Sequence, residues 1–215
     1  MHLQLLHEDD ALLVFDKPAG LLAVPGRGAD KQDSLAWRAQ QRWPDAMVVH
    51  RLDMATSGLM LMARGAQPQR RLSLAFEQRE VHKRYVAVVD GLMRAQPDAL
   101  NGWDAIDLPI AVDWPNRPLR IISAELGKPS VTRWRVIAHD DAARSTRLEL
   151  EPVTGRSHQL RVHLKALGHT ILGDALYADA RVLAGATRLL LHATTLGLTH
   201  PVSGQPMTFE SRAPF

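Results

Sequence analysis

The chain has 215 residues, 46% of them hydrophobic, which is enough to bury a substantial core in one large domain or two fused halves. It contains no cysteine, which excludes disulfides, thiolate catalysis and cysteine-ligated metal sites, and no apolar run approaches the roughly 20 residues of a membrane span. The net charge of +3 and the 21 arginines beside 5 lysines favour a polyanionic partner, although a genome rich in G and C would also raise the arginine count.

The first half of the chain is expected to alternate short strands with two helices. Its start lacks the basic and apolar stretches of a signal peptide, so we expect a cytoplasmic protein. One helix should begin at an N-cap on Asp33 or Ser34 and end near Trp43, just before Pro44. A second helix should cover residues 68–79. The predicted strands cover residues 3–6, 12–15, 47–49, 58–63 and 85–89.

The second half is expected to begin with long loops and short strands over residues 96–129, a stretch rich in Pro, Asp, Asn and Gly. Residues 131–138 and 146–151 alternate as two paired strands joined by a charged turn, and residues 189–191 and 197–199 are predicted as closing strands. Strands that are grouped together with few crossover helices indicate an α+β sheet.

The clearest predicted helix of this half covers residues 157–167. Thr154 or Ser157 could cap its start, and Gly168 stands just after its predicted end, where glycine is favoured. The leucines at 160, 164 and 167 are predicted to share one buried face. His158 and His163 are five residues apart, so they do not face one side as zinc ligands would, and no metal site is expected.

Three segments carry polar residues in otherwise apolar or turn-forming surroundings. Residues 50–58 place Asp53 in a loop between two strands, where it is either a reactive carboxylate or an ordinary turn residue. Residues 154–161 place Arg156 at a helix start, where it could contact phosphate, pair with a buried carboxylate or simply be exposed. Tyr85 lies on a strand and could equally be a core aromatic. None of the three is decisive alone.

Together, and in this order, these segments resemble the RluA family of pseudouridine synthases. The segment His50-Arg51-Leu52-Asp53 is similar to the family's active-site signature, and residues 83–87 and 154–161 are similar to its second and third motifs. Further matching segments are residues 16–21, 127–129, 168–169, 173–177 and 189–193. The resemblance covers essentially the whole chain.

The resemblance implies an α+β pseudouridine synthase fold, with a large mixed, mainly antiparallel central sheet flanked by helices and long loops. Residues 1–215 would then form a single catalytic domain. Many relatives carry an additional N-terminal S4 RNA-binding domain, and none is expected here, because the first family motif begins close to the start of the chain.

The implied reaction breaks the N1–C1′ bond of a uridine, turns the base and rejoins it through C5, without a cofactor. Asp53 would act either as a nucleophile at C1′ or as a base that removes a sugar proton. Arg156 would pair with Asp53 and keep it ionised. Arg51 would fill the space left by the flipped base, Tyr85 would stack on the uracil, and Leu191 would form an apolar wall.

The implied partner is structured RNA. Residues 113–118 are similar to the same segment of family members that modify both large-subunit ribosomal RNA and a tRNA anticodon stem-loop. Ribosomal RNA and tRNA are therefore the expected substrates. The chain is expected to act as a monomer. Lys83, Arg117 and Arg120 are candidates for contacts with RNA phosphates, and the region around Trp114 is expected to contribute specificity.

Two other functions are alternatives to this one. A non-catalytic RNA-binding or ribosome-assembly protein could retain the fold, but it would not need Asp53, Tyr85 and Arg156 together. A hydrolytic glycosidase usually has two carboxylates flanking the bond that it cleaves, whereas only Asp53 lies in a strong motif here.

Overall fold

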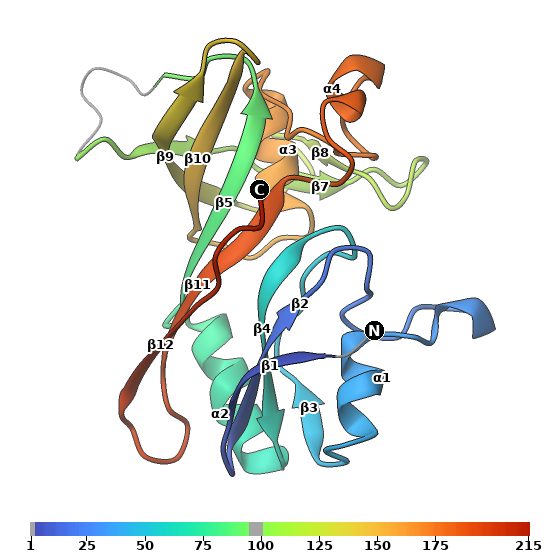
Figure 1. The fold of residues 1–215 in the computed structure, drawn as a ribbon, viewed down its shortest axis with the longest axis vertical. Helices are drawn as coiled ribbons and strands as arrows, with labels where there is room; N and C mark the ends of the chain where they lie inside the picture. Colours follow the sequence, from blue (N-terminus) through green and yellow to red (C-terminus); the bar gives the residue numbers. More distant parts are fainter. Residues whose placement is uncertain (1–2, 95–100) are drawn as a thin grey trace. The chain divides into compact units, whose positions relative to one another are not determined.

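The computed structural model describes residues 3–94 and 101–215 and has the predicted α+β composition (Figure 1). The chain divides into two compact units. Unit 1 comprises Met1–Lys83 and His192–Pro214, and unit 2 comprises Arg84–Leu191 and Phe215. The single catalytic domain over residues 1–215 stays a prediction, and the part of the predicted loop at 96–100 lies outside the described residues.

Unit 1 contains a mixed sheet. Its strands are β1 (Gln4–Glu8), β2 (Leu12–Lys17), β3 (Ala46–Val48), β4 (Ser57–Arg64), β11 (Leu191–Thr199) and β12 (Pro206–Glu210). The order is β1–β2–β4–β11, with β12 paired to β11 and β3 paired to β4. β4 and β11 are parallel and the other pairs are antiparallel. The strongly apolar sequences of β2 and β4 follow from their central position, since both are buried along nearly their whole length.

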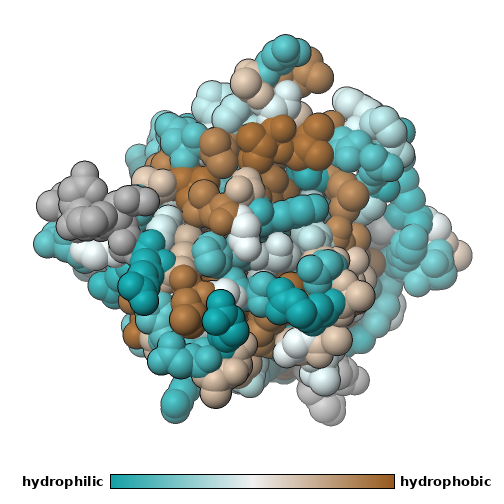
Figure 2. All heavy atoms as spheres, turned by 90° about the horizontal axis from the view of Figure 1, so that it is seen from above, coloured by the Kyte–Doolittle hydropathy of each residue, from teal (hydrophilic) through white to brown (hydrophobic). Residues whose placement is uncertain are grey.

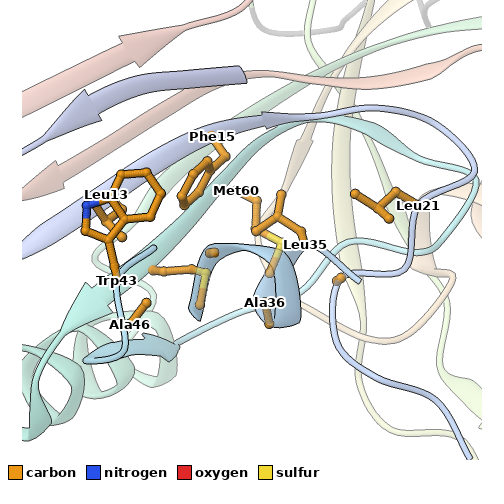
Figure 3. Packing of buried hydrophobic residues seen from close by; sticks show 11 residues of the cluster. Leu13, Phe15, Leu21, Leu35, Ala36, Trp43, Ala46 and Met60 are labelled. Carbon is orange, nitrogen blue, oxygen red and sulfur yellow. The ribbon is translucent and has the colours of Figure 1, made fainter. Parts of the chain in front are cut away.

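Helix α1 (Leu35–Gln40) packs against this sheet through one hydrophobic cluster (Figure 3). Ser34 is its N-cap, as predicted, and accepts a hydrogen bond from the Trp37 backbone N–H. The helix ends at Gln40, earlier than predicted, and Trp43 then turns into the core, where its ring meets Phe15 edge-on and its Nε1–H donates to Glu8. The labelled side chains of the cluster come from the helix, from β2, β3 and β4, from the loop after β2 and from the turn after α1.

Helix α2 (Ala66–Glu77) starts two residues before the predicted helix and buries Leu72. Its end is closed by a bond from the Glu80 N–H to the Ala75 carbonyl, with Arg79 in the left-handed conformation at φ 63°. That position usually carries glycine, because a side chain there meets the neighbouring backbone. A short 3-10 helix (Ala29–Lys31) lies in the exposed loop before α1.

Unit 2 contains an antiparallel sheet in the order β5–β10–β9–β6. These strands are β5 (His82–Asp90), whose first two residues belong to unit 1, β6 (Asp104–Asp107), β9 (Val131–Asp140) and β10 (Ser145–Pro152). The predicted pair at 131–138 and 146–151 is therefore confirmed, and its charged turn lies between Asp140 and Ser145. A separate pair, β7 (Ile110–Val112) and β8 (Arg120–Ile122), lies in the predicted loop region.

Helix α3 (Gln159–Ala166) begins two residues later than predicted, and neither expected cap is correct. His158, in the left-handed conformation, occupies the N-cap position without a side-chain cap, and the Thr154 hydroxyl instead accepts the Val131 N–H. Leu160 and Leu164 are buried, but Leu167 is 41% exposed because it lies beyond the last turn. Gly168 follows at φ 80°, as the C-terminal glycine signal predicted.

Three other features differ from the prediction. Of the two closing strands predicted at 189–191 and 197–199, residues 191 and 197–199 belong to one strand, β11, while residues 189 and 190 lie before it. Neither β12 nor the short helix α4 (Ala180–Ala184) was predicted. In the described residues, no helix is both long and apolar enough to cross a membrane. The surface is mixed, and Figure 2 shows apolar patches among hydrophilic side chains on one face of the molecule.

Candidate active site

The predicted site residues are divided between the two units. Unit 1 carries Arg51, Asp53 and Lys83, and unit 2 carries Tyr85, Arg117, Arg120, Arg156 and Leu191.

Asp53 lies on a tight turn that leads directly into β4. The turn is closed by a hydrogen bond of 3.1 Å from the Thr56 N–H to the Asp53 carbonyl. The Asp53 side chain is half-buried, while Leu52 on one side and Thr56 on the other are buried. A carboxylate at a turn between buried residues is held in place without being removed from solvent, which suits a reactive group.

A buried lysine holds this turn. Lys17, at the end of β2, has no exposed surface, and its Nζ donates to the carbonyls of Pro18 at 2.9 Å, Leu21 at 2.8 Å and Met54 at 3.1 Å. The Met54 carbonyl also accepts the Gly20 N–H. Three acceptors satisfy the three hydrogens of the ammonium group, which makes its burial tolerable. The residue after Asp53 is thereby tied to the loop that follows β2.

His50 supports the other end of the segment. Its ring stacks on Phe76 of α2 with centroids 4.5 Å apart, and its Nε2 accepts the Leu61 N–H at 2.9 Å. Burial, and secondly the positive charge of Lys83, lower the pKa of His50 to about 3. The imidazole is therefore neutral at ordinary pH, with its hydrogen on Nδ1.

A chain of hydrogen bonds begins at Ser57, the first residue of β4. Ser57 Oγ and His192 Nδ1 are 2.8 Å apart, His192 Nε2 and Ser211 Oγ are 3.0 Å apart, and Ser211 donates to Asp16. Because Ser211 gives its hydrogen to Asp16, its oxygen accepts from His192 Nε2–H, and in the neutral form of the ring Nδ1 then accepts from Ser57. The chain links β2, β4, β11 and the segment after β12 within unit 1.

The two cations of unit 1 that were predicted as site residues, Arg51 and Lys83, differ in their surroundings. Arg51 is exposed, and Lys83 is half-buried at the start of β5. Burial, and secondly the charge of Arg79, lower the pKa of Lys83. Neither side chain has a hydrogen-bonding or ion-pairing partner within residues 3–94 and 101–215. Both are therefore available to a ligand.

In unit 2, Tyr85 and Leu191 occupy strand positions. Tyr85 lies on β5 opposite Leu150 of β10 and is half-buried, so its ring is accessible in part. Leu191 is buried, with 3% of its surface exposed, at the first position of β11. A partly exposed aromatic ring and a buried leucine are suited to stacking and to an apolar wall respectively.

The segment before α3 is organised by Gln159. Its Oε1 accepts from the Thr154 hydroxyl at 2.7 Å and from the Arg156 N–H at 3.0 Å, and its Nε2 donates to the Val131 carbonyl at 2.9 Å. The Arg156 side chain is exposed and, among residues 3–94 and 101–215, reaches only the Pro129 carbonyl, at 3.4 and 3.5 Å. The backbone at Arg156 is thus fixed while its guanidinium is weakly held.

Helix α3 is anchored by a buried ion pair. Arg161 and Asp174 are 4% and 0% exposed, and their two hydrogen bonds measure 2.8 Å and 2.5 Å. The Asp174 carboxylate also accepts two backbone N–H groups, and the Tyr177 ring lies 5.1 Å from the Arg161 guanidinium. The Tyr177 hydroxyl accepts the Arg120 N–H and bonds to His158 Nδ1. The segment at 173–177 therefore fixes the helix that follows Arg156.

In the loop between β7 and β8, the Arg117 side chain lies over the ring of Trp114. The Arg117 guanidinium lies 4.7 Å from the centroid of Trp114, which is 64% exposed. The Arg120 side chain instead turns back to the Pro118 and Leu119 carbonyls. An exposed tryptophan beside an arginine is typical of surfaces that bind unpaired bases.

Several supporting residues were not singled out from the sequence. Lys17, His192, Asp174 and Gln159 all lie in segments that matched family motifs, but only the fold shows which groups they hold. No three His, Asp or Glu side chains converge as metal ligands in the parts of the chain that the structure describes. The predicted site residues themselves are one carboxylate, four arginines, a lysine, a tyrosine and a leucine.

A family model described as RNA pseudouridylate synthase matches residues 11–166. The dual-specificity RNA pseudouridine synthase RluA of Yersinia pestis is 48% identical over 210 residues, which are 98% of both chains. RluA of Escherichia coli strain K12 is 47% identical over 99% of this chain and 94% of that protein. RluA of Vibrio vulnificus is 45% identical over 93% of this chain and 79% of that protein.

Two solved structures of human proteins are also similar to this chain. Human RNA pseudouridylate synthase domain containing 1 superposes with a TM-score of 0.82 and 26% identity, over 100% of this chain and 84% of the human chain. Human RNA pseudouridylate synthase domain containing 4 has a TM-score of 0.75 and 25% identity, over 98% and 88%.

Proposed function

Since the chain belongs to the RNA pseudouridylate synthase family and isomerises uridine in RNA to pseudouridine, we propose that Asp53 is the carboxylate that carries the reaction. The predicted fold class and reaction are confirmed by the family match and the structural neighbours. The observation that supports Asp53 is its place on the turn that Lys17 holds at the entry to β4.

The reaction exchanges one bond to C1′ for another. The N1–C1′ bond breaks, the C5–C1′ bond forms, C5 loses its proton and N1 gains one, so no atom is lost. Asp53 would either attack C1′ as a nucleophile, which forms a covalent intermediate, or remove a sugar proton as a base. Both routes need an ionised carboxylate beside the sugar.

The remaining site residues are proposed to handle the flipped nucleotide. Tyr85 would stack on the uracil, and Leu191 would line the apolar side of its pocket. Arg51, which is exposed and unpartnered within the described residues, would fill the gap in the RNA stack. The pairing of Arg156 with Asp53 stays a prediction. A double-mutant cycle that combines changes at both positions would measure it, because paired residues give non-additive losses.

The substrates are proposed from the relatives. The proteins from Yersinia pestis and Escherichia coli are named dual-specificity enzymes and share 48% and 47% identity with this chain. We infer that this chain also accepts two kinds of RNA, a large-subunit ribosomal RNA and a tRNA anticodon stem-loop, and that it acts as a monomer. Lys83, Arg117 and Arg120 are proposed to contact phosphates, and Trp114 to contribute specificity.

The test is the substitution Asp53→Asn, which keeps the shape of the side chain and removes its charge. Pseudouridine formation on a tRNA transcript and on a ribosomal RNA transcript should fall at least about 100-fold, the lower end of what a positioned acid or base contributes. RNA binding should persist.

The matched control is Asp10→Asn, which removes an exposed carboxylate from the turn before β2 and should leave turnover unchanged. Wild-type turnover in the Asp53 variant would show that another group carries the reaction.

A further inference from the structure

Four polar side chains of unit 1 form a line of hydrogen bonds to which the proposed reaction gives no part. They are Ser57, His192, Ser211 and Asp16, together called the serine–histidine chain here. Ser57 and His192 are 3% and 2% exposed. Apolar side chains of similar size could fill this buried place at similar stability, whereas a fully bonded polar network specifies one arrangement.

The serine–histidine chain joins three strands at the point where β4 begins. Ser57 is the first residue of β4, and His192 of β11 is its Cα partner in the parallel register. Their side chains bond across 2.8 Å. Asp16 lies near the end of β2, which pairs with β4 on its other side, and Ser211 connects it to His192. The first residue of β4 is therefore tied to both neighbouring strands.

The hydrogens of the serine–histidine chain all point towards Asp16. An ionised carboxylate only accepts, so Ser211 donates to it, and the Ser211 oxygen accepts from His192 Nε2–H at 3.0 Å. In the neutral form of the ring, Nδ1 then accepts the hydroxyl hydrogen of Ser57. One carboxylate of β2 thus sets the orientation of a hydroxyl group at the start of β4.

The start of β4 is also the end of the turn that carries Asp53. The N–H of Thr56, the residue before β4, closes this turn on the Asp53 carbonyl at 3.1 Å. Earlier in the turn, Lys17 donates to the Met54 carbonyl at 3.1 Å. Asp16 and Lys17 are adjacent on β2, where successive side chains leave opposite faces of the sheet. Two adjacent residues of one strand therefore hold the two ends of the turn.

We propose that the serine–histidine chain positions the catalytic carboxylate. It fixes the start of β4 and, through the Thr56 N–H, the direction in which the Asp53 side chain leaves the turn. Its members act through the backbone and are positioning residues. The inference rests on the proposed function of Asp53. A misplacement of about 1 Å at a reacting group can cost roughly 100-fold in rate, so a carboxylate on a short turn requires a rigid support.

The experiment breaks the serine–histidine chain at two places. Ser57→Ala removes the hydroxyl at the turn, and Ser211→Ala removes the half-buried hydroxyl that joins His192 to Asp16. Single-turnover pseudouridine formation, on an RNA transcript that the wild-type protein modifies, should slow by about 10-fold to 100-fold in each variant. KM and RNA affinity should stay within about twofold, because positioning acts on the transition state.

Two further variants separate positioning from a general loss of stability. Ser211→Thr keeps a hydroxyl group at a half-buried site and should restore the rate. The double variant Ser57→Ala with Ser211→Ala should be no slower than the slower single variant, because both serines belong to one network and their effects are not additive.

The matched control is Ser203→Ala in the hairpin between β11 and β12. Ser203 Oγ lies 3.0 Å from His200 Nδ1, so this substitution also removes a serine–histidine contact, but at an exposed site. It should leave the rate unchanged. Hydrogen exchange at the Thr56 amide follows the turn directly. Well below the unfolding midpoints, this amide should exchange faster in the Ser57→Ala and Ser211→Ala variants than in the wild type or the control.

Wild-type rates in both single variants would overturn the proposal. So would a rate loss that Ser211→Thr does not restore, or one of equal size in Ser203→Ala, because a general loss of stability would then explain it. Faster exchange at Thr56 together with wild-type rates would give the serine–histidine chain a purely structural role and would also overturn the proposal.

The serine–histidine chain and the catalytic assignment fail separately. If Asp53→Asn abolished turnover while both serine variants kept wild-type rates, the carboxylate assignment would stand and the positioning role would be wrong. If Asp53→Asn retained turnover, the carboxylate assignment would be wrong, and exchange at Thr56 alone would decide whether the serine–histidine chain holds the turn.

Discussion

At the scale of single residues, the turn that carries Asp53 is held by a buried lysine, Lys17. Lys17 lies wholly inside unit 1 and gives its three hydrogens to backbone carbonyls, one of them in the residue after Asp53. The sequence places Lys17 in a motif near the start of the chain, but its spacing from Asp53 gives no sign that the two segments meet. Only the antiparallel pairing of β2 with β4 brings them together.

Lys17→Met tests this dependence. Methionine has a similar length but no donor, so the carbonyls of Pro18, Leu21 and Met54 would lose the ammonium partner that they share. The free energy of unfolding should fall by about 2–5 kcal/mol, since each buried unsatisfied polar group costs about 1–3 kcal/mol. Pseudouridine formation should also fall, because the turn that holds Asp53 loosens.

Chemical denaturation at neutral pH measures the change, with Lys31→Met as the control at an exposed lysine. Equal stabilities of the two variants would mean that the three hydrogen bonds do not hold the turn.

At the scale of elements, the entry to β4 depends on a close approach of two backbones. Gly58 pairs with Ala193 of β11 in the parallel register and has a φ of 107°. A Cβ added at Gly58 would lie 2.3 Å from the Ala193 carbonyl oxygen and 2.6 Å from its nitrogen. Both neighbours are backbone atoms, so the strands would have to separate.

Gly58→Ala should therefore lower the free energy of unfolding by more than about 4 kcal/mol. Losses of this size are exceptional for one substitution and occur when core packing is severely disrupted. Gly65→Ala is the matched control, because Gly65 has a φ of 80° but its added Cβ meets nothing within 4 Å. That control should cost only the backbone strain, about 1–2 kcal/mol. Urea unfolding of both variants checks the difference, and similar losses would contradict the predicted clash.

Most elements could be predicted because their hydrophobic patterns are strong. The runs that form β2 and β4 and the alternation of β9 and β10 are visible in the sequence. β12 was not predicted because it is only five residues long and starts at a proline, and its alternation rests on two apolar residues, Met207 and Phe209. The start of α3 was misplaced because Thr154 could cap a helix, yet its hydroxyl is used by Val131 and Gln159.

At the scale of the whole molecule, the residues proposed for one reaction are spread over both compact units. Their order along the chain was enough to predict the family and the reaction, because several motifs had to agree at once. The supporting groups could not be predicted in the same way. His192 and Asp174 act through partners that are far away in sequence, at Ser57 and Arg161.

The measurement that tests the central claim most directly maps pseudouridines in ribosomal RNA and tRNA from cells that lack this gene. The account predicts that one or more sites are lost, that the wild-type gene restores them, and that the gene carrying Asp53→Asn does not. An unchanged map, or restoration by the Asp53→Asn gene, would contradict it.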